Sequence, residues 1–216
     1  MANLEYSTLI MIHTNSINFV FVSSNKNKIH DFELIAKELS DKFGIEITVK
    51  SFQPEVDVEE NGSSTIENAL IKLDNAVKEF KGDEIIFTED TAFYISGLDY
   101  KPGILAHRWG GDDPCGKVLK TIPKNSIDHY AYYECSIAYK NLKGETKQAV
   151  GQTHGYIANE KRGSLSFGYD QIFVDNHVAD LRAKTVSELS EIQPDKSFHF
   201  HRIDAFSKMI KQLLED

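Results

Sequence analysis

The first half of the chain alternates short apolar runs with segments of helical periodicity, and this order constrains the fold more than any other feature. Residues 18–22 and 45–49 are rich in β-branched or aromatic side chains, residues 85–88 are largely apolar, and each run predicts a strand. Apolar residues recur at helical spacing over residues 29–39 and 64–80. Strands that alternate with helices favour an α/β fold with parallel strands.

The second half of the chain departs from this alternation. Residues 129–140, a turn that contains glycine, and an extended run through Ile157 predict a long antiparallel hairpin. A short strand is expected at residues 172–174 and an amphipathic helix over residues 197–214. The sequence therefore predicts an α/β protein with a mixed sheet.

Composition excludes several functional classes. The 216 residues include 24 Lys+Arg and 33 Asp+Glu, a formal net charge of −9, which argues against nucleic acid or an anionic membrane as a partner. No run approaches the ~20 apolar residues of a membrane span. The two cysteines, Cys115 and Cys135, form no disulfide framework, and we expect a cytoplasmic location. Residues 1–17 read as an N-terminal extension and residues 18–216 as one domain.

A polar turn follows the first predicted strand and precedes the first predicted helix. Unpaired N–H groups at a helix start favour an anion, so phosphate is the expected ligand, while a solvated helix cap is the alternative. The turn consists of two hydroxyls, two amides and two lysines: Ser23, Ser24, Asn25, Lys26, Asn27 and Lys28.

Two groups of carboxylates complement this turn. Glu89 and Asp90 come where the third predicted strand ends, the edge at which open α/β sheets bind ligands. Glu59 and Glu60 lie in an acidic loop, which could equally be solvated surface. Carboxylates of this kind suit Mg²⁺, which takes one or two acidic ligands together with water and substrate phosphates. A lysine-bearing turn with acidic metal ligands predicts triphosphate hydrolysis.

Seven short motifs in order resemble the inosine triphosphate pyrophosphatase family over residues 18–212. They are SSNxxK at 23–28, ExxG with IENA over 59–69, EDT at 89–91, PGxxxxRWxG at 102–111, FGYDxIF at 167–173, KTxxEL at 184–189 and HR at 201–202. The resemblance implies a twisted mixed sheet whose flanking helices form two lobes around a central cleft. It also implies a homodimer that cleaves ITP, dITP and XTP to the monophosphate and pyrophosphate, using Mg²⁺.

The resemblance implies roles for individual residues at the phosphate end of the substrate. Asp90 matches the catalytic, metal-binding aspartate, with Glu89 beside it, and Lys28 would contact the triphosphate. The second metal ligand would be Glu59, with Glu60 as the adjacent competitor. Thr91 falls at a substrate-contacting position, and Arg108 is a further candidate for the phosphates.

The resemblance also implies a base-binding end. Its members are Phe167, Gly168, Tyr169, Asp170, His201 and Arg202, while Lys196 matches a substrate-contacting lysine that could offset charge on the leaving group. An arginine donor at the 6-keto edge would accept hypoxanthine or xanthine and reject adenine, because the wrong base leaves buried polar groups unpaired.

Four positions depart from the family pattern, and they leave base preference open. Ser24 and Asn27 stand where the family has glycine in the phosphate turn, Gln171 replaces a proline, and Phe200 replaces a serine before the HR pair. A related nucleotide pyrophosphatase with altered base preference is therefore one alternative. A nucleotide-sensing protein that kept the fold without turnover is the other.

Overall fold

A computed structural model describes residues 16–56, 58–123, 128–165, 167–178 and 184–216. The predicted N-terminal extension lies outside these residues except for its last two, Ser16 and Ile17, which belong to the first strand. In chain order the elements are β1 (Ser16–Val22), α1 (Lys26–Phe43), β2 (Glu46–Phe52), α2 (Thr65–Glu79), β3 (Ile85–Ile95), the 3-10 turn η1 (Ser96–Leu98), β4 (Lys101–Gly103), α3 (Ala106–Gly110), α4 (Pro114–Thr121), β5 (Tyr130–Lys140), β6 (Thr146–Ile157), β7 (Phe173–Asp175), α5 (Val186–Ile192) and α6 (Phe200–Glu215).

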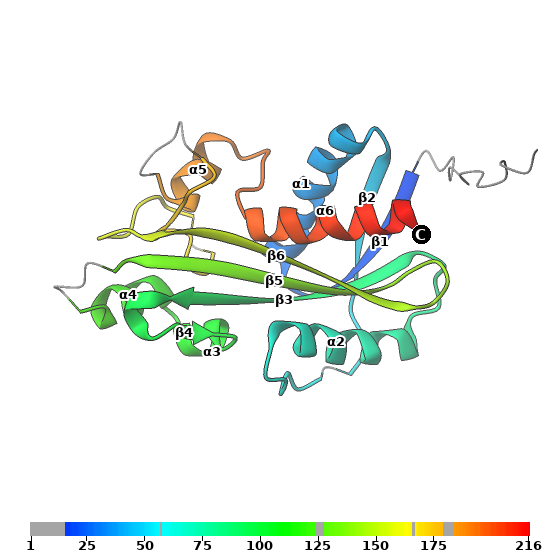
Figure 1. Cartoon of the computed structure of the whole chain (residues 1–216), viewed down its shortest axis with the longest axis horizontal. Coiled ribbons are helices and arrows are strands. Elements are labelled where there is room, and N and C mark those ends of the chain that lie inside the picture. Colours follow the sequence, from blue (N-terminus) through cyan, green and yellow to red (C-terminus); the bar gives the residue numbers. More distant parts are fainter. Residues whose placement is uncertain (1–15, 57, 124–127, 166, 179–183) are drawn as a thin grey trace, which may run out of the picture.

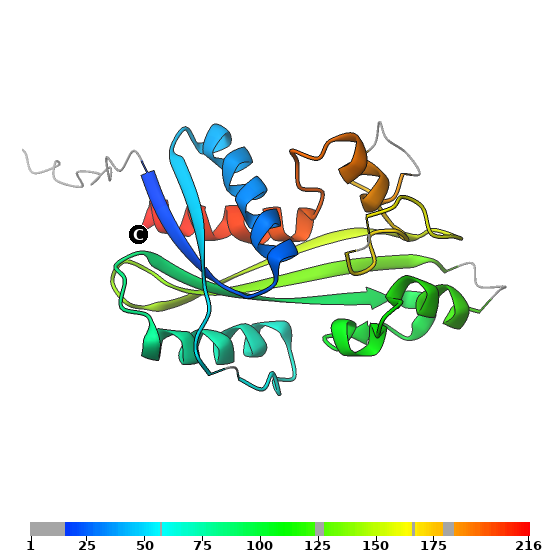
Figure 2. The ribbon, with the colours of Figure 1, turned by 180° about the vertical axis from the view of Figure 1, so that it is seen from behind.

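A mixed sheet forms the centre of the described chain, as the sequence predicts. Its strand order is β2-β1-β3-β5-β6-β7, with β4 paired to β3. β1 is parallel to β2 and β3, whereas β5, β6 and β7 follow as antiparallel neighbours. Helices α1 and α6 cover one face of the sheet and α2 covers the other (Figure 1; Figure 2 shows the reverse view). None of the helices described is long and apolar enough to cross a bilayer.

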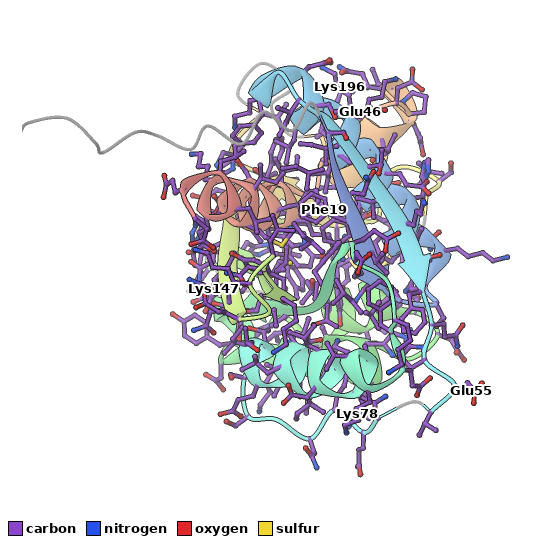
Figure 3. All side chains as sticks on the ribbon, turned by 90° about the vertical axis from the view of Figure 1, so that its right-hand side faces the viewer. Phe19, Glu46, Glu55, Lys78, Lys147 and Lys196 are labelled. Carbon is purple, nitrogen blue, oxygen red and sulfur yellow. The ribbon has the colours of Figure 1, made fainter. Side chains whose placement is uncertain are left out.

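The core under α1 and α6 is built largely of aromatic rings. Phe19 lies at its centre (Figure 3), fully buried, with its ring 5.0 Å from that of Phe206 on α6. Phe21 and Phe87 stack at 4.9 Å across β1 and β3, and Phe32 of α1 meets both. Each ring buries a large apolar area, so this cluster fixes both helices on the sheet.

β3 differs from its predicted extent, because it continues seven residues past Thr88 to Ile95. The prediction that Glu89 and Asp90 end the strand is therefore wrong. Both carboxylates lie inside β3, 3% and 6% exposed, and on a strand they face opposite sides of the sheet. Two adjacent charged residues usually indicate the end of a strand. Here they remain inside β3 because cationic and amide side chains from other elements pair with them, as shown below.

Helix α5 is an element that the sequence analysis did not predict. Thr185 caps it through a capping box with Glu188, in which each side chain bonds the other residue's backbone N–H. That Thr-x-x-Glu spacing is visible in the sequence and could have located the helix start.

β6 and α6 come unusually close at Gly151. A Cβ added there would lie 2.2 Å from the carbonyl oxygen of His201 and 2.3 Å from the backbone nitrogen of Ala205, closer than real contacts allow. Because both neighbours are backbone atoms of one helix, α6 can rest on the sheet in this position only where β6 carries glycine.

We therefore expect Gly151→Ala to lower the free energy of unfolding by about 2–3 kcal/mol, since the added methyl group pushes α6 off the sheet. Urea denaturation measures this change. The control is Val150→Thr, one residue away on the opposite face and 39% exposed, for which a change within about 0.5 kcal/mol is expected. An alanine variant as stable as the parent protein would contradict the close approach.

Candidate active site

The candidate site lies where β3 passes beyond the end of β1. β1 pairs with β3 only through Phe87, and β4 begins to pair with it at Phe93. Between these points β3 is paired on its other side, to β5. The chain leaves β1 toward α1 on one face, whereas α2 leads into β3 from the other face. This is a topological switch point, the place where open α/β sheets bind ligands.

The predicted phosphate turn stands at this point and is ordered by its own side chains. The Oδ1 atom of Asn25 accepts hydrogen bonds from the backbone N–H groups of Asn27 and Lys28 at 3.0 and 3.3 Å, and so caps α1. Ser23 Oγ accepts from the Asn25 N–H at 3.1 Å. A cavity of about 220 Å³ opens beside the turn, and its lining includes Ser23, Ser24, Asn25, Lys28, Glu60, Lys72 and Glu89. Lys26 and Asn27 are exposed beside it.

Glu89 anchors the turn from the face that α1 and α6 cover. The ammonium group of Lys28 contacts its Oε1 atom, and the Thr91 hydroxyl donates to Oε2 at 2.6 Å. The Nε of Arg202 lies 4.0 Å from Oε2. Burial alone would raise the pKa of Glu89, but the charges of Lys28, Arg202 and Lys72 hold it well below its usual value. Glu89 is thus ionised, and its carboxylate pairs with cationic side chains of the protein.

Asp90 faces the opposite side of the sheet, toward α2. Asn68 Nδ2 donates to its Oδ2 at 3.1 Å, and Lys72 Nζ lies 3.4 Å from its Oδ1. Burial raises the pKa of Asp90 above its usual value, Lys72 opposes this, and the charges of Glu89 and Glu60 add to it. Asp90 therefore holds a proton more readily than a surface aspartate does, a property suited to handling the proton of a water molecule.

Glu60, and not Glu59, reaches this group. Lys72 Nζ lies 3.3 Å from Glu60 Oε1, so the same ammonium bridges Glu60 and Asp90. Glu59 is exposed and does not line the cavity. The geometry therefore favours the competitor over Glu59 as the second metal ligand. Arg108 lies at the same loop, with Nη2 3.5 Å from the Glu60 carbonyl oxygen.

The oxygens around Lys72 suit a hard divalent cation. The carboxylates of Glu60 and Asp90 both contact the ammonium group of Lys72, so the two can also approach a single bound cation. When both are ionised, the three side chains carry a net charge of −1. Among the described residues no group of three or more acidic, histidine or cysteine side chains could hold a metal. A Mg²⁺ ion here would take two carboxylates and complete its shell with water and phosphate oxygens, as is usual for this ion.

Three of the base-binding candidates, Phe167, Asp170 and Arg202, lie near the amino-terminal end of α6 and adjoin a buried ion network. Arg202 is 3% exposed and donates from Nη1 to Asp31 Oδ2 at 2.9 Å, while its guanidinium carbon lies 5.4 Å from the ring centre of Phe167. Asp170 is 5% exposed and pairs with His199, which also pairs with Asp31.

The other base-binding candidates either make contacts within the fold or lie at the surface. The Tyr169 hydroxyl donates to the Ala106 carbonyl at 2.7 Å within an apolar cluster. His201 is 1% exposed, its ring stacks on Tyr133 at 4.6 Å, and neither ring nitrogen has a partner among the described residues. Gly168 accepts from a cysteine thiol through its carbonyl, and Lys196 is exposed. The structure thus brings Phe167, Asp170 and Arg202 together and leaves Lys196 at the surface.

The sequence analysis missed four polar residues of the site: Asn68, Lys72, Asp31 and His199. Asn68 and Lys72 lie one turn apart on α2, so both reach Asp90 from one helix face. Polar residues at that spacing beside an apolar stripe were a usable signal. Asp31 and His199 are far apart in the sequence, so no local spacing pattern indicates that they form an ion pair.

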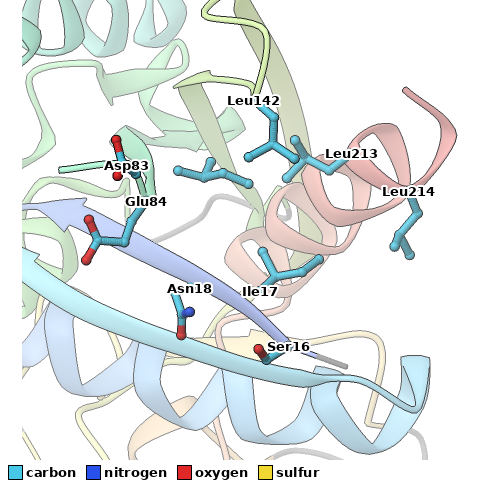
Figure 4. A pocket seen from close by; sticks show the side chains of 9 residues that line it. Ser16, Ile17, Asn18, Asp83, Glu84, Leu142, Leu213 and Leu214 are labelled. Atoms are coloured by element: carbon cyan, nitrogen blue, oxygen red, sulfur yellow. The ribbon is translucent and has the colours of Figure 1, made fainter. Parts of the chain in front are cut away.

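A second cavity, of about 280 Å³, lies at the opposite end of β1 (Figure 4). Its lining is mostly apolar, including Ile17, Leu142, Leu213 and Leu214, with Asp83 and Glu84 at its edge. Among the residues that the structure describes, no lysine or arginine lines it. Although this cavity is the larger of the two, a triphosphate requires positive charge, and the cavity beside Lys28 supplies it.

The fold and the site together define an α/β protein with a helix-capping turn and an acidic, lysine-bridged cluster at a switch point. The Ham1 family model matches residues 19–212. A Staphylococcus aureus (strain MW2) protein named dITP/XTP pyrophosphatase is 32% identical over 184 residues, covering 83% of this chain and 89% of that protein. A Halalkalibacterium halodurans protein of the same name is 31% identical over 203 residues, covering 89% and 98%.

A solved structure shows the same relationship. The Staphylococcus aureus Ham1 protein is 29% identical, covers 92% of this chain and 98% of its own, and superposes with a TM-score of 0.68. The chain therefore belongs to the Ham1 family, which confirms the resemblance found in its motifs and the predicted fold class.

The ion pairs of His199 predict a stability that depends on pH. Burial alone would lower the pKa of His199, but the charges of Asp31 and Asp170 and its hydrogen bonds to both raise it from 6.5 to about 10. Below pH 6.5 this stabilisation is fully present. Above pH 6.5 the unfolded chain releases a proton that the folded chain keeps, so the stabilisation falls until the pH passes the folded pKa.

We expect the difference in unfolding free energy between the protein and His199→Gln to shrink by up to about 1.4 kcal/mol per pH unit between pH 6.5 and 10. Urea denaturation at a series of pH values measures it. Comparing the two proteins cancels the titration of the buried cysteines, Cys115 and Cys135, which both share. A difference that stays constant over this range would show that folded His199 is uncharged.

Proposed function

We propose that the protein is a nucleoside triphosphate pyrophosphatase that hydrolyses non-canonical purine nucleotides, ITP, dITP and XTP, to the monophosphate and pyrophosphate with Mg²⁺. The observation that carries the proposal is the convergence of Lys28 and Lys72 with Glu60 and Glu89 on one cavity beside the helix-capping turn. The names of the Staphylococcus and Halalkalibacterium relatives support the substrate class.

The phosphate end of the substrate would lie against the turn and the two lysines. Backbone N–H groups at the start of α1 and the ammonium groups of Lys28 and Lys72 offset the charge of the phosphates and of the leaving pyrophosphate. When bound between Asp90 and Glu60, Mg²⁺ would neutralise phosphate oxygens. Asp90 would orient or deprotonate the water that attacks the α-phosphorus, while ionised Glu89 holds Lys28 in place.

The nucleobase would lie near Phe167 and Arg202. Arg202 donates to Asp31 with Nη1, and its remaining N–H groups are the donors available to a 6-keto oxygen. Because Arg202 is buried and held by an ion pair, its position is fixed before the base arrives, which favours discrimination between a keto and an amino group.

The direct test is pyrophosphate release from ITP, dITP, XTP, GTP, ATP and dUTP, each with and without Mg²⁺. We expect the first three to exceed ATP by at least about 100-fold in kcat/KM, and chelation of the metal to abolish turnover. Preference for a canonical or pyrimidine nucleotide would favour the altered pyrophosphatase. Binding without turnover on any triphosphate would favour the nucleotide sensor.

Replacement of Asp90 tests the chemistry separately from the fold. We expect Asp90→Asn to lower kcat by at least about 1,000-fold, because the amide neither takes a proton nor replaces a carboxylate ligand. Its thermal unfolding should stay close to that of the parent, since Asn68 and Lys72 still have polar partners there. Asp74→Asn, at an exposed position on the same helix as Lys72, is the matched control and should keep full activity. Near-normal turnover by Asp90→Asn would remove Asp90 from the mechanism.

A homodimer and a cytoplasmic location are the remaining parts of the proposal. The first rests on the resemblance, and the second rests on the two cysteines, which form no disulfide framework. Light scattering of the purified protein measures the first directly, and fluorescence microscopy of the tagged protein in its own cells measures the second.

A further inference from the structure

His199 is held between two carboxylates that come from distant parts of the chain. Its Nδ1 lies 2.9 Å from Asp31 Oδ1 on α1, and its Nε2 lies 3.2 Å from both side-chain oxygens of Asp170, in the turn before β7. The imidazole side chain is 12% exposed. A neutral imidazole has one N–H group and the cation has two, so only the cation can donate to both carboxylates at once.

Each carboxylate also belongs to the base end of the site. Asp31 accepts from Arg202 Nη1 at 2.9 Å and from Ser197 Oγ at 2.5 Å. Asp170 is the last residue of the turn that begins at Phe167. The backbone N–H of Asp170 donates a hydrogen bond to the Phe167 carbonyl oxygen at 3.1 Å. The Phe167 ring in turn meets the His199 ring edge to face, with centres 5.6 Å apart. His199 therefore connects the helix that carries Arg202 to the segment that carries Phe167.

The charges around His199 balance only when it is a cation. The groups that face it are Asp31 from α1, Asp170 from the turn before β7, and Arg202 and His201 from α6. Burial and the nearby charges of Arg202 and His199 lower the pKa of His201, which stays neutral. Two carboxylates thus face Arg202 and His199, and loss of His199 leaves one buried negative charge without a partner.

We propose that His199 is a positioning residue for base recognition: by bridging Asp31 and Asp170 it holds the Phe167–Asp170 segment and Arg202 in fixed relation, and so sets affinity for the base. The proposal rests on the proposed function, because it takes this end of the site to receive the nucleobase. The phosphate end depends instead on Lys28, Lys72, Glu60 and Asp90, and none of the four contacts His199 directly in the described structure. Glu89, Arg202 and Asp31 stand between Lys28 and His199.

The test separates the two ends of the substrate by means of two probes. ITP reports on both ends, whereas inorganic tripolyphosphate, used as a competitive inhibitor, reports on the phosphate end alone. We expect His199→Phe to raise KM for ITP at least about tenfold with kcat within about threefold, and to leave the tripolyphosphate inhibition constant within about twofold. A general structural defect would weaken both probes together.

Two conservative variants and one control sharpen the result. His199→Asn keeps a donor near the Nδ1 position and His199→Gln keeps one near Nε2, so each should recover part of the lost affinity for ITP. His177→Phe is the matched control, because His177 also pairs with a carboxylate, Asp175 at 3.0 Å, but its side chain is 54% exposed. That variant should bind ITP as the parent does.

The charge of His199 can also be measured directly, without an activity assay. Nitrogen NMR of the full-length protein at pH 8 should show both ring nitrogens of His199 protonated. A neutral ring, an unchanged KM for ITP in His199→Phe, or equal loss of ITP and tripolyphosphate affinity would each overturn the inference. Failure of the proposed function is distinct, because the parent protein would then show no hydrolysis of ITP, while the NMR result would still report the charge of His199.

Discussion

The pairing of buried charges is the constraint on which the rest of this structure depends. Six ionic groups alternate in sign through the interior, from Lys28 to Glu89, Arg202, Asp31, His199 and finally Asp170. A buried charge without a partner is strongly unfavourable, so each member requires its neighbours. Because the six come from α1, β3, α6 and the turn before β7, the network specifies how these elements meet as well as how the site is charged.

β3 connects this network to a second one on the other side of the sheet. Successive residues of a strand face opposite directions, so Glu89 joins the cations near α1 and α6 while Asp90 joins Lys72 and Asn68 of α2. The two carboxylates therefore have different tasks. Glu89 is saturated by cations of the protein, whereas the group around Asp90 keeps an excess negative charge that a metal ion can offset.

Local sequence patterns predicted most of the helices and strands, and the resemblance to the family supplied most of the candidate site residues. Both were insufficient where long-range pairing decides the outcome. The capped turn at Asn25 was visible because short-range chemistry determines it. The continuation of β3 through Glu89 was not, because a charged pair ends a strand unless distant residues compensate it. The contact of Glu60 with Lys72 depends on how one loop meets α2, and the position of His199 depends on a contact with a residue 168 positions away.

The contact between Gly151 and α6 has a consequence for how base preference can change. The first turn of α6 carries both His201 and Arg202, and the absence of a methyl group on β6 sets the height of that turn above the sheet. Base preference can therefore change more readily by substitution of side chains on α6 than by movement of α6 relative to the sheet. Phe200, the bulky departure from the family pattern on the same turn, is a substitution of this kind, and directed evolution of substrate range would begin at that position.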